Sequence, residues 1–484
     1  MKLFAESNQH LDKMITIAQN FSGDIKMKFV FEKCAILNIQ RGKVCTNDTP
    51  IGEIQPLQTN EQYKYLGIME NNEIDHKTLK EKLKEEYRKR LTKLLNTYLN
   101  GRNMIDAINT WAIPSLTYSF GIVKWNETEL EELDYMTRRL LGKFRMLHPK
   151  SCVERLYLSR KDGGRGLVNI KRLCMKQELD MKKRIQKSND NIMKKIVEVD
   201  KKYTPLNLSE TMNPNIQPNT KDDLINQWKS KSIHGRYINQ IQDQNVNKTL
   251  SFNWLKRGEL HPETEGFYMA IQDKVMRTKN YEKHILKIDV EDKCRKCHRD
   301  GETIEHIVGG CPELANNVYL GRHNQVAKII HQNIAQDLNL LKNFTPFYKY
   351  TPENILENKD TVIYWDVPIL TDRSIAHNRP DIIVIDKRNK SATIIDIAIP
   401  LTHNINKTEQ EKINKYQDLK TEIVSSWKLK TATVVPIVIS TDGVISNSFL
   451  KHITQHQIIE TVIQKAQKSV ILSTTSIIRK VLNE

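Results

Sequence analysis

Two aspartates inside apolar, β-branched segments constrain the fold of this 484-residue chain more than any other feature of its sequence. Residues 379–400 read RPDIIVIDKRNKSATIIDIAIP, in which Asp381 opens one apolar run and Asp396 interrupts a second run after a polar turn. Burying an unpaired carboxylate in a strand is costly. Mg²⁺ or Mn²⁺ would offset that cost, because such an ion takes one or two carboxylates and leaves its other positions to water and phosphate. The pattern predicts a metal site on a hairpin; the alternative is that both aspartates end strands and pair with Arg379 or a nearby lysine.

The segments around this pair alternate between strand and helix. The pattern predicts strands at 381–386 and 392–399, a helix at about 407–427, a strand at 433–439 and a helix from about 446. This order resembles the PD-(D/E)xK nuclease core, which implies cleavage of a phosphodiester bond with a lysine two residues beyond the second acid. That position is Ala398 here, so we expect Lys412 on the following helix to replace that lysine, with Lys415 as second candidate. The lysine would position or deprotonate the attacking water, and Glu409 on the same helix face could be a further acidic ligand.

A second group of residues has the spacing of a metal site. Cys294, Cys297, His306 and Cys311 form the pattern C-x2-C-x8-H-x4-C. Four such ligands complete a tetrahedral Zn²⁺ site, and a site closed by four protein ligands is structural rather than catalytic. His298 is a rival ligand, disfavoured because it directly follows Cys297. The alternative to zinc is a set of buried cysteines beside an unrelated histidine.

The composition of the chain limits which binding partners and which cellular compartment can be expected. The net charge of +17 favours a polyanionic partner such as nucleic acid; the alternative is a basic protein without a specific partner. The sequence has no apolar stretch of about eighteen residues, so it predicts no membrane span. The segment MKLFAESNQHLDK lacks the apolar region of a secretory signal. Seven unevenly spaced cysteines indicate a reducing compartment, where metal binding is favoured over disulfides.

The first 290 residues are predicted to be mainly helical and basic. The pattern predicts a helix at roughly 9–20 capped by Ser7 or Asn8, followed by strands around Met27–Phe31 and Ala35–Ile39. It then predicts a charged helix over 75–100 that ends at Gly101, and helices over 105–147 that are broken or started at Pro114. The remaining segments are a glycine-rich loop at Asp162–Gly166, basic helices over Lys171–Lys202, a linker at 203–222 and further helices over 223–290. The many Lys and Arg side chains suit a nucleic-acid backbone. They also suit a solvated helix face.

Several short motifs occur in a characteristic order. They are KYLG at 64–67, IPSLTYSFGIVKW at 113–125, RKDGGRGL at 160–167, the cysteine–histidine spacing, and RPD at 379–381 with KINKYQDL at 412–419. In this order they resemble the C-terminal part of a polyprotein from a site-specific non-LTR retrotransposon. In that family a reverse transcriptase is followed by a Cys-Cys-His-Cys knuckle and a restriction-like endonuclease.

The resemblance implies a multidomain fold of α+β and α/β parts. The implied segments are a partial reverse-transcriptase palm at 1–70, a helical thumb-like region at 71–202, a linker and helical region at 203–290, a small zinc knuckle at 291–325, and a restriction-like endonuclease of PD-(D/E)xK type at 326–484. In the family, a Tyr-x-Asp-Asp turn lies just upstream of a segment like KLFAES, which begins this chain. We therefore expect the polymerase half to be incomplete and the chain alone to make no DNA.

The resemblance also assigns nucleic-acid contacts. Lys33 would lie near the incoming nucleotide, and Tyr65 and Gly67 would belong to a primer-grip hairpin. Three basic residues, Arg165, Lys171 and Arg172, would contact the nucleic-acid backbone. These roles follow from the resemblance alone.

The implied activity is metal-dependent nicking of target DNA by a truncated retrotransposon protein. The nick would expose a 3′ hydroxyl that primes reverse transcription of the element's RNA. The expected partners are therefore a DNA target and the retroelement RNA, without a membrane, and the expected location is the nucleus after synthesis and assembly in the cytoplasm. The alternative is a non-catalytic nucleic-acid-binding remnant of a retroelement, in which the acids and the lysine do not converge around one metal.

Overall fold

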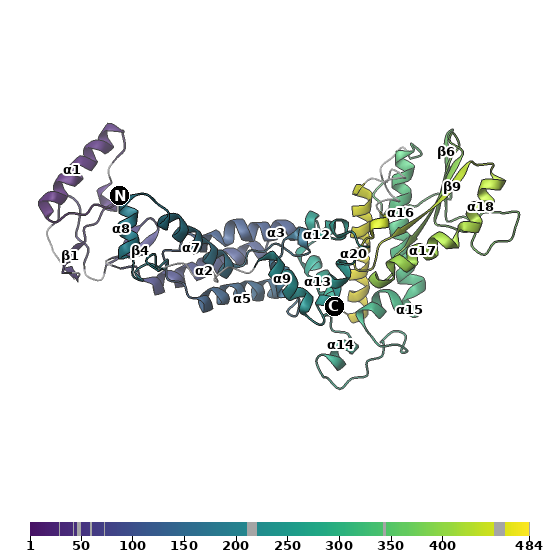
Figure 1. The fold of residues 1–484 in the computed structure, drawn as a ribbon, viewed down its shortest axis with the longest axis horizontal. Helices are drawn as coiled ribbons and strands as arrows, with labels where there is room; N and C mark the ends of the chain where they lie inside the picture. The colour runs from purple at the N-terminus through teal and green to yellow at the C-terminus, as the bar shows by residue number, and fades with distance from the viewer. Residues whose placement is uncertain are drawn as a thin grey trace. The chain divides into compact units, whose positions relative to one another are not determined.

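Contacts within the chain group it into two units. Unit 1 comprises Met1–Lys89, Pro114–Glu129 and Cys174–Met212, and unit 2 comprises Arg90–Ile113, Leu130–Leu173 and Asn213–Glu484. The computed structural model describes residues 1–28, 30–41, 43–45, 50–58, 61–71, 73–210, 220–341, 345–449 and 460–483. Within these ranges no helix combines the length and the apolar character needed to cross a bilayer. The fold mixes helices with sheets, as expected for the α+β class (Figure 1).

Helices dominate the chain up to residue 340. Those in its first 200 residues are α1 (Asn8–Asp24), α2 (His76–Leu95), α3 (Gly101–Ala107), α4 (Pro114–Thr117), α5 (Glu127–Lys143), α6 (Val153–Tyr157), α7 (Ile170–Gln186) and α8 (Asn191–Val199). Those that follow are α9 (Lys221–Ser230), α10 (Gly235–Ile241), α11 (Lys248–Ser251), α12 (Asn253–Arg257), α13 (Pro262–Gln272), α14 (Lys279–His284), α15 (Pro312–Leu314) and α16 (Leu320–Asp337). Ser7 caps α1 and Pro114 begins α4, so both of these local predictions are confirmed.

Two other local predictions are wrong. The described residues of Met27–Phe31 form no strand, and Phe31 instead begins a 3-10 turn, because an apolar run alone does not decide between strand and turn. Gly101 does not end the long helix but begins α3. Glycine is needed at this position for a different reason: a Cβ atom there would lie only 2.4 Å from Oε2 of Glu265.

Unit 1 contains two short hairpins. β1 (Asn38–Gln40) pairs with β2 (Lys43–Cys45), and β3 (Tyr63–Tyr65) pairs with β4 (Ile68–Glu70), both antiparallel. Leu66 and Gly67 form the turn of the second hairpin with φ angles of 49° and 88°, a backbone that glycine accepts without strain. The hydroxyl of Tyr118 donates to the Leu66 carbonyl at 2.6 Å. The KYLG motif is therefore a hairpin, held from outside by Tyr118.

A five-stranded sheet forms the C-terminal part of unit 2. Its strands are β5 (Ile355–Glu357), β6 (Thr361–Trp365), β7 (Ile382–Asp386), β8 (Ser391–Ala398) and β9 (Thr431–Val438), in the order β5-β6-β7-β8-β9. Neighbours are antiparallel except β8 and β9, which are parallel. A parallel pair needs a crossover, supplied here by α17 (Ile405–Lys415) and α18 (Gln417–Ser426). The strands at 381–386, 392–399 and 433–439 are confirmed, whereas β5 and β6 were not expected.

Helices cover both faces of this sheet (Figure 1). On one face Ile382, Ile395 and Ile397 pack with apolar residues of α16 and of α20 (Glu460–Leu482). On the other face Ile383 and Ile394 pack with the α18 side. Because side chains alternate along a strand, the position after Ile395 in β8 belongs to this second face.

A histidine is buried beneath the sheet without full hydrogen bonding. His331 on α16 is 0% exposed, and its Nδ1 lies 2.8 Å from the hydroxyl of Tyr350. Its Nε2 has no hydrogen-bond partner, and the ring of Trp365 packs edge-on against the imidazole. Burial lowers the pKa of His331 from 6.5 to about 4, because a charged ring there would lose its hydration.

This histidine predicts an acid-sensitive fold. The neutral ring stabilises the folded state fully above pH 6.5, and this contribution is lost as the pH falls through about 4. The change corresponds to roughly 3 kcal/mol of unfolding free energy. Urea unfolding followed by circular dichroism at pH 7, 5.5 and 4.5 should show a flatter pH dependence in His331→Phe than in the wild type. His377→Phe, which replaces an exposed histidine, should leave the dependence unchanged, and an equally steep curve for His331→Phe would refute the assignment.

Candidate functional site

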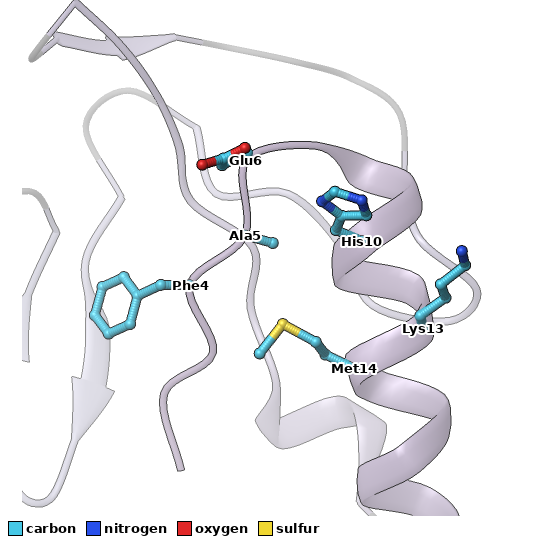
Figure 2. Close-up of a pocket in the computed structure, with 6 residues that line it drawn as sticks. All are labelled: Phe4, Ala5, Glu6, His10, Lys13 and Met14. Carbon is cyan, nitrogen blue, oxygen red and sulfur yellow. The ribbon is translucent and has the colours of Figure 1, made fainter.

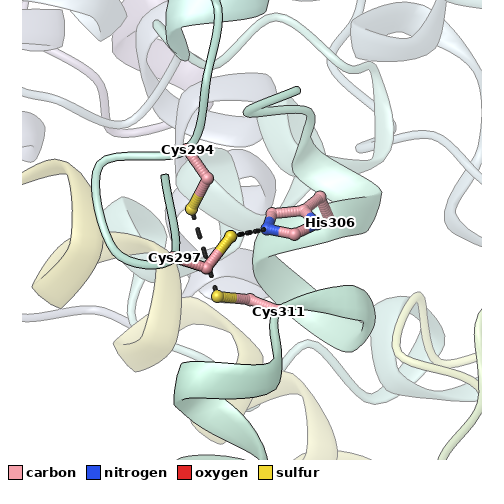
Figure 3. A group of neighbouring side chains, drawn as sticks. All are labelled: Cys294, Cys297, His306 and Cys311. Carbon is pink, nitrogen blue, oxygen red and sulfur yellow. Dashed lines mark hydrogen bonds between the residues drawn. The ribbon is translucent and has the colours of Figure 1, made fainter. Parts of the chain in front are cut away.

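The four residues of the cysteine–histidine pattern come together in unit 2 (Figure 3). Their ligand atoms all lie within 4.8 Å of one another. Cys294 Sγ is 4.0 Å from Cys311 Sγ, and Cys297 Sγ is 3.3 Å from Nε2 of His306. In a tetrahedral zinc site with bonds of about 2.0–2.3 Å, ligand atoms are roughly 3.3–3.8 Å apart. The cluster therefore fits a structural zinc with only small adjustment.

The surroundings of the cluster shift the pKa values of two of its thiols in opposite directions, which matters because the thiolate is the form that binds metal. The N–H groups of Arg299 and Asp300 lower the pKa of the Cys297 thiol to about 6. Burial raises the pKa of Cys311 to about 11, so a bound cation would be needed to hold that thiolate. The hydroxyl of Tyr319 accepts from the Cys311 N–H at 3.2 Å and donates to the Ile307 carbonyl at 2.7 Å.

The rival ligand and the other cysteines lie apart from this cluster. His298 is exposed, with a positive φ of 57°, and is not one of the clustered ligands. The remaining cysteines are free thiols, namely Cys34, Cys45, Cys152 and Cys174. Elsewhere in the described part of the chain, no three His, Cys, Asp or Glu side chains approach closely enough to hold a metal by themselves.

The two aspartates lie side by side at one end of the sheet. The last pair of β7 with β8 is Ile382 with Ile395, and Asp381 and Asp396 each lie one position beyond it along the chain. Asp396 belongs to the face that carries Tyr416 and Leu419 and is only 2% exposed.

Asp396 meets two side chains from the helices that follow it. Its Oδ1 accepts a hydrogen bond of 2.7 Å from the hydroxyl of Tyr416, and its Oδ2 lies 2.5 Å from Nζ of Lys412. The ammonium is close but is not aligned as a donor, so this buried oxygen is paired by charge without a hydrogen bond. Burial, and next the charge of Asp396, raise the pKa of Tyr416, which therefore stays a neutral donor.

Asp381 is held from the opposite layer of the fold. Its Oδ2 accepts from the Ile397 N–H at 2.7 Å and lies 3.1 Å from Nε2 of His323, the fourth residue of α16. The same Nε2 is 3.1 Å from the Ile397 carbonyl. Burial alone would lower the pKa of His323. The hydrogen bond with Asp381 and the charge of that carboxylate outweigh burial and raise the pKa to about 9. No local sequence pattern marks His323, which lies 58 residues from its partner.

The other residues expected near the acids have different partners. The ammonium of Lys415 lies 4.7 Å from the centroid of the Tyr416 ring rather than at a carboxylate. Glu409 is buried and accepts hydrogen bonds of 2.5 Å from Ser446 and from Ser448. Arg379 pairs with Asp366, with Nε 2.8 Å from Oδ1. Of the two candidate lysines, Lys412 is thus the one that contacts an acid of the pair.

The expected nucleic-acid contacts of unit 1 lie on or near its surface. Lys33 and Gly67 are exposed, and Tyr65 is partly buried. The Tyr65 ring has the ammonium of Lys2 at 4.6 Å from its centroid. The hydroxyl of Tyr63 donates to the backbone carbonyl of Lys33.

The residues of unit 2 that were expected to contact nucleic acid differ in their exposure to solvent. Arg165 is 1% exposed, and its Nε donates to Oε1 of the fully buried Glu265 at 2.9 Å. This guanidinium therefore supports the fold and does not present a charge to a nucleic acid, which corrects the expectation from the glycine-rich motif. Lys171 is partly exposed and pairs with Glu131 at 2.8 Å, while Arg172 is partly exposed.

A hollow of about 560 Å³ lies at the start of α1 in unit 1 (Figure 2). It is lined by Phe4, Ala5, Glu6, His10, Lys13 and Met14. Phe4 is 84% exposed, and the polar side chains that line the hollow are exposed as well. Ligand sites bury most of their ligand, so this open surface carries no candidate chemistry.

No protein-family model matches this chain, and no curated protein matches it. The resemblance to non-LTR retrotransposon proteins therefore rests on the quoted motifs alone.

The cysteine–histidine cluster predicts one bound zinc per chain. With free zinc at about 1,000 times its Kd, loss of the ion would remove about 4 kcal/mol of stability. Metal analysis of the purified chain should find one zinc, and chelation or His306→Ala should remove it and lower the Tm. His298→Ala is the matched control and should keep the ion. Full zinc content in His306→Ala would contradict the site.

Proposed function

We propose that this chain is a metal-dependent nuclease that nicks DNA. One observation carries the proposal: Nζ of Lys412 lies 2.5 Å from Oδ2 of Asp396, whose cross-strand neighbour is Asp381. Two carboxylates and one lysine therefore belong to the same end of the sheet, which supports a shared site. These are the groups that hydrolysis of a phosphodiester needs, namely metal ligands and a cation at the reacting phosphate.

Each residue has a separate role in the proposed reaction. Asp381 and Asp396 would hold Mg²⁺ or Mn²⁺, which lowers the pKa of bound water and offsets charge on the phosphate when bound. Lys412 would turn its ammonium toward the phosphate and position the attacking water. Tyr416 would keep Oδ1 of Asp396 occupied as an acceptor, so that Oδ2 faces the reaction.

The substrate class follows from charge and from the resemblance. A net charge of +17 supports a nucleic-acid substrate. The resemblance to non-LTR retrotransposon proteins supports a DNA target, a retroelement RNA as second partner, and action in the nucleus. It also supports a structural zinc in the cysteine–histidine cluster, in addition to the Mg²⁺ or Mn²⁺ of the proposed nuclease.

A plasmid-nicking assay in Mg²⁺ or Mn²⁺ tests the proposal. Asp381→Asn and Asp396→Asn should each lower the rate at least about a hundredfold, because each removes a metal ligand. Lys412→Met should lower it by about 10²–10⁴-fold. Two matched controls, Asp386→Asn at the far end of β7 and Lys415→Met on the same helix, should nick at close to the wild-type rate.

The same assay separates the nuclease from a non-catalytic remnant that only binds nucleic acid. One observation favours the remnant, since each acid already has a cationic partner, Lys412 or His323. Under that reading the wild type folds and binds DNA but does not nick. Equal nicking by the wild type and by both aspartate variants would mean that the cleavage comes from another source.

A further inference from the structure

His323 makes contacts that a packing residue would not need. Its Nε2 faces two acceptors, Oδ2 of Asp381 and the carbonyl of Ile397, both at 3.1 Å. A carbonyl can only accept, so Nε2 must carry a proton and donate. The side chain is about three-quarters buried, with 25% of its surface exposed.

We propose that His323 is a positioning residue of the nuclease centre, which fixes the carboxylate of Asp381 so that one oxygen is left for the metal. The proposal rests on the proposed nuclease function. It concerns the orientation of the ligand and does not depend on any change in the charge of His323.

The hydrogen bonds determine which oxygen is left. Oδ2 of Asp381 already has the Ile397 N–H at 2.7 Å and Nε2 of His323 at 3.1 Å. Within the described part of the chain, both hydrogen bonds of this carboxylate go to Oδ2, and no residue donates to Oδ1. Two donors on one oxygen restrict rotation of the carboxylate about its Cβ–Cγ bond, so Oδ1 is presented in one direction. Groups that orient a metal ligand in this way change metal affinity when they are removed.

The helix that carries His323 is itself firmly held. Val326, Ile329 and Ile330 of α16 are buried against the sheet. Nη1 of the preceding Arg322 donates to Thr474 of α20 at 3.2 Å. The ring Nδ1 of His323 lies 3.1 Å from Oδ1 of Asn324. The imidazole is thus fixed at both nitrogens and by the backbone that bears it, as positioning requires.

The carboxylate pair is therefore supported from two layers of the fold. Lys412 and Tyr416 reach Asp396 from the α17 and α18 side. His323 reaches Asp381 from α16, which packs on the opposite face. The two acids can be adjusted separately, and a substitution at His323 should affect Asp381 first.

The test compares His323→Ala with His323→Gln in the zinc-loaded chain. The Gln side-chain amide nitrogen can stand near the position of Nε2 and donate, whereas Ala cannot. Nicking is measured against Mn²⁺ concentration, and Mn²⁺ binding is measured by electron paramagnetic resonance without DNA. We expect His323→Ala to raise both the half-saturating Mn²⁺ concentration and the Mn²⁺ Kd by about 10–100-fold. DNA affinity should stay unchanged, and His323→Gln should recover most of the loss.

The controls separate this role from a general effect on folding. His331→Gln alters the second histidine of α16, which is fully buried and has Tyr350 as its partner; it should lower stability without changing the half-saturating Mn²⁺ concentration. Unchanged Mn²⁺ dependence in His323→Ala, beside a wild type that nicks and an Asp381→Asn variant that does not, would overturn the positioning role and leave the nuclease standing. A wild type that neither nicks nor binds Mn²⁺ more tightly than Asp381→Asn would overturn both.

Discussion

The pairing of β7 with β8 is the constraint on which the candidate nuclease centre depends. The register that sets Ile382 opposite Ile395 also sets Asp381 opposite Asp396. A shift of one residue would send one carboxylate to the other face of the sheet, because side chains alternate along a strand. The four-residue turn that joins the strands opposes this shift, because the length of the turn sets the register of a hairpin. The backbone N–H and the side-chain amide of Asn389 in that turn both donate to the carboxylate of Asp386, which holds the turn in place.

The cysteine–histidine cluster and the proposed nuclease centre differ in the kind of ion that each would bind. The cysteine–histidine cluster offers three soft sulfurs and a nitrogen in a closed set, which suits zinc and leaves no position for a substrate. The aspartate pair offers hard oxygens and too few protein ligands to enclose an ion, which suits Mg²⁺ or Mn²⁺ with water and phosphate. Ligand type and openness would therefore separate zinc from the Mg²⁺ or Mn²⁺ of the proposed nuclease centre.

Sequence reasoning succeeded where the relevant contacts are local. The zinc-type ligands lie within eighteen positions of one another, and the acidic hairpin closes through a four-residue turn, so spacing alone revealed both. Helical periodicity placed Lys412 against the sheet, where it meets Asp396. It did not reveal that the expected helix at 407–427 breaks at Tyr416, where the side chain reaches Asp396.

The failures involve contacts between distant parts of the chain. Arg165 is recruited by Glu265, one hundred residues away, and a basic residue after a glycine loop gives no sign of such a buried partner. His323 reaches Asp381 across 58 residues, and a single histidine near the start of a helix has no distinctive pattern. Gly101 was interpreted as a helix terminator, because the side chain of Glu265 that excludes a Cβ atom is invisible in the local sequence.

Lys412 lies on a helix and not on β8, so its position beside Asp396 depends on the length of the chain that precedes it. A lysine on β8 would keep its place beside the acid whatever happened to the connection after the strand. Lys412 instead lies on α17, and the connection of residues 399–404 fixes the rotational phase of that helix. One residue added at the start of the helix would turn its ammonium by about 100° away from Asp396. Length variation in evolution should therefore be suppressed between residues 398 and 412.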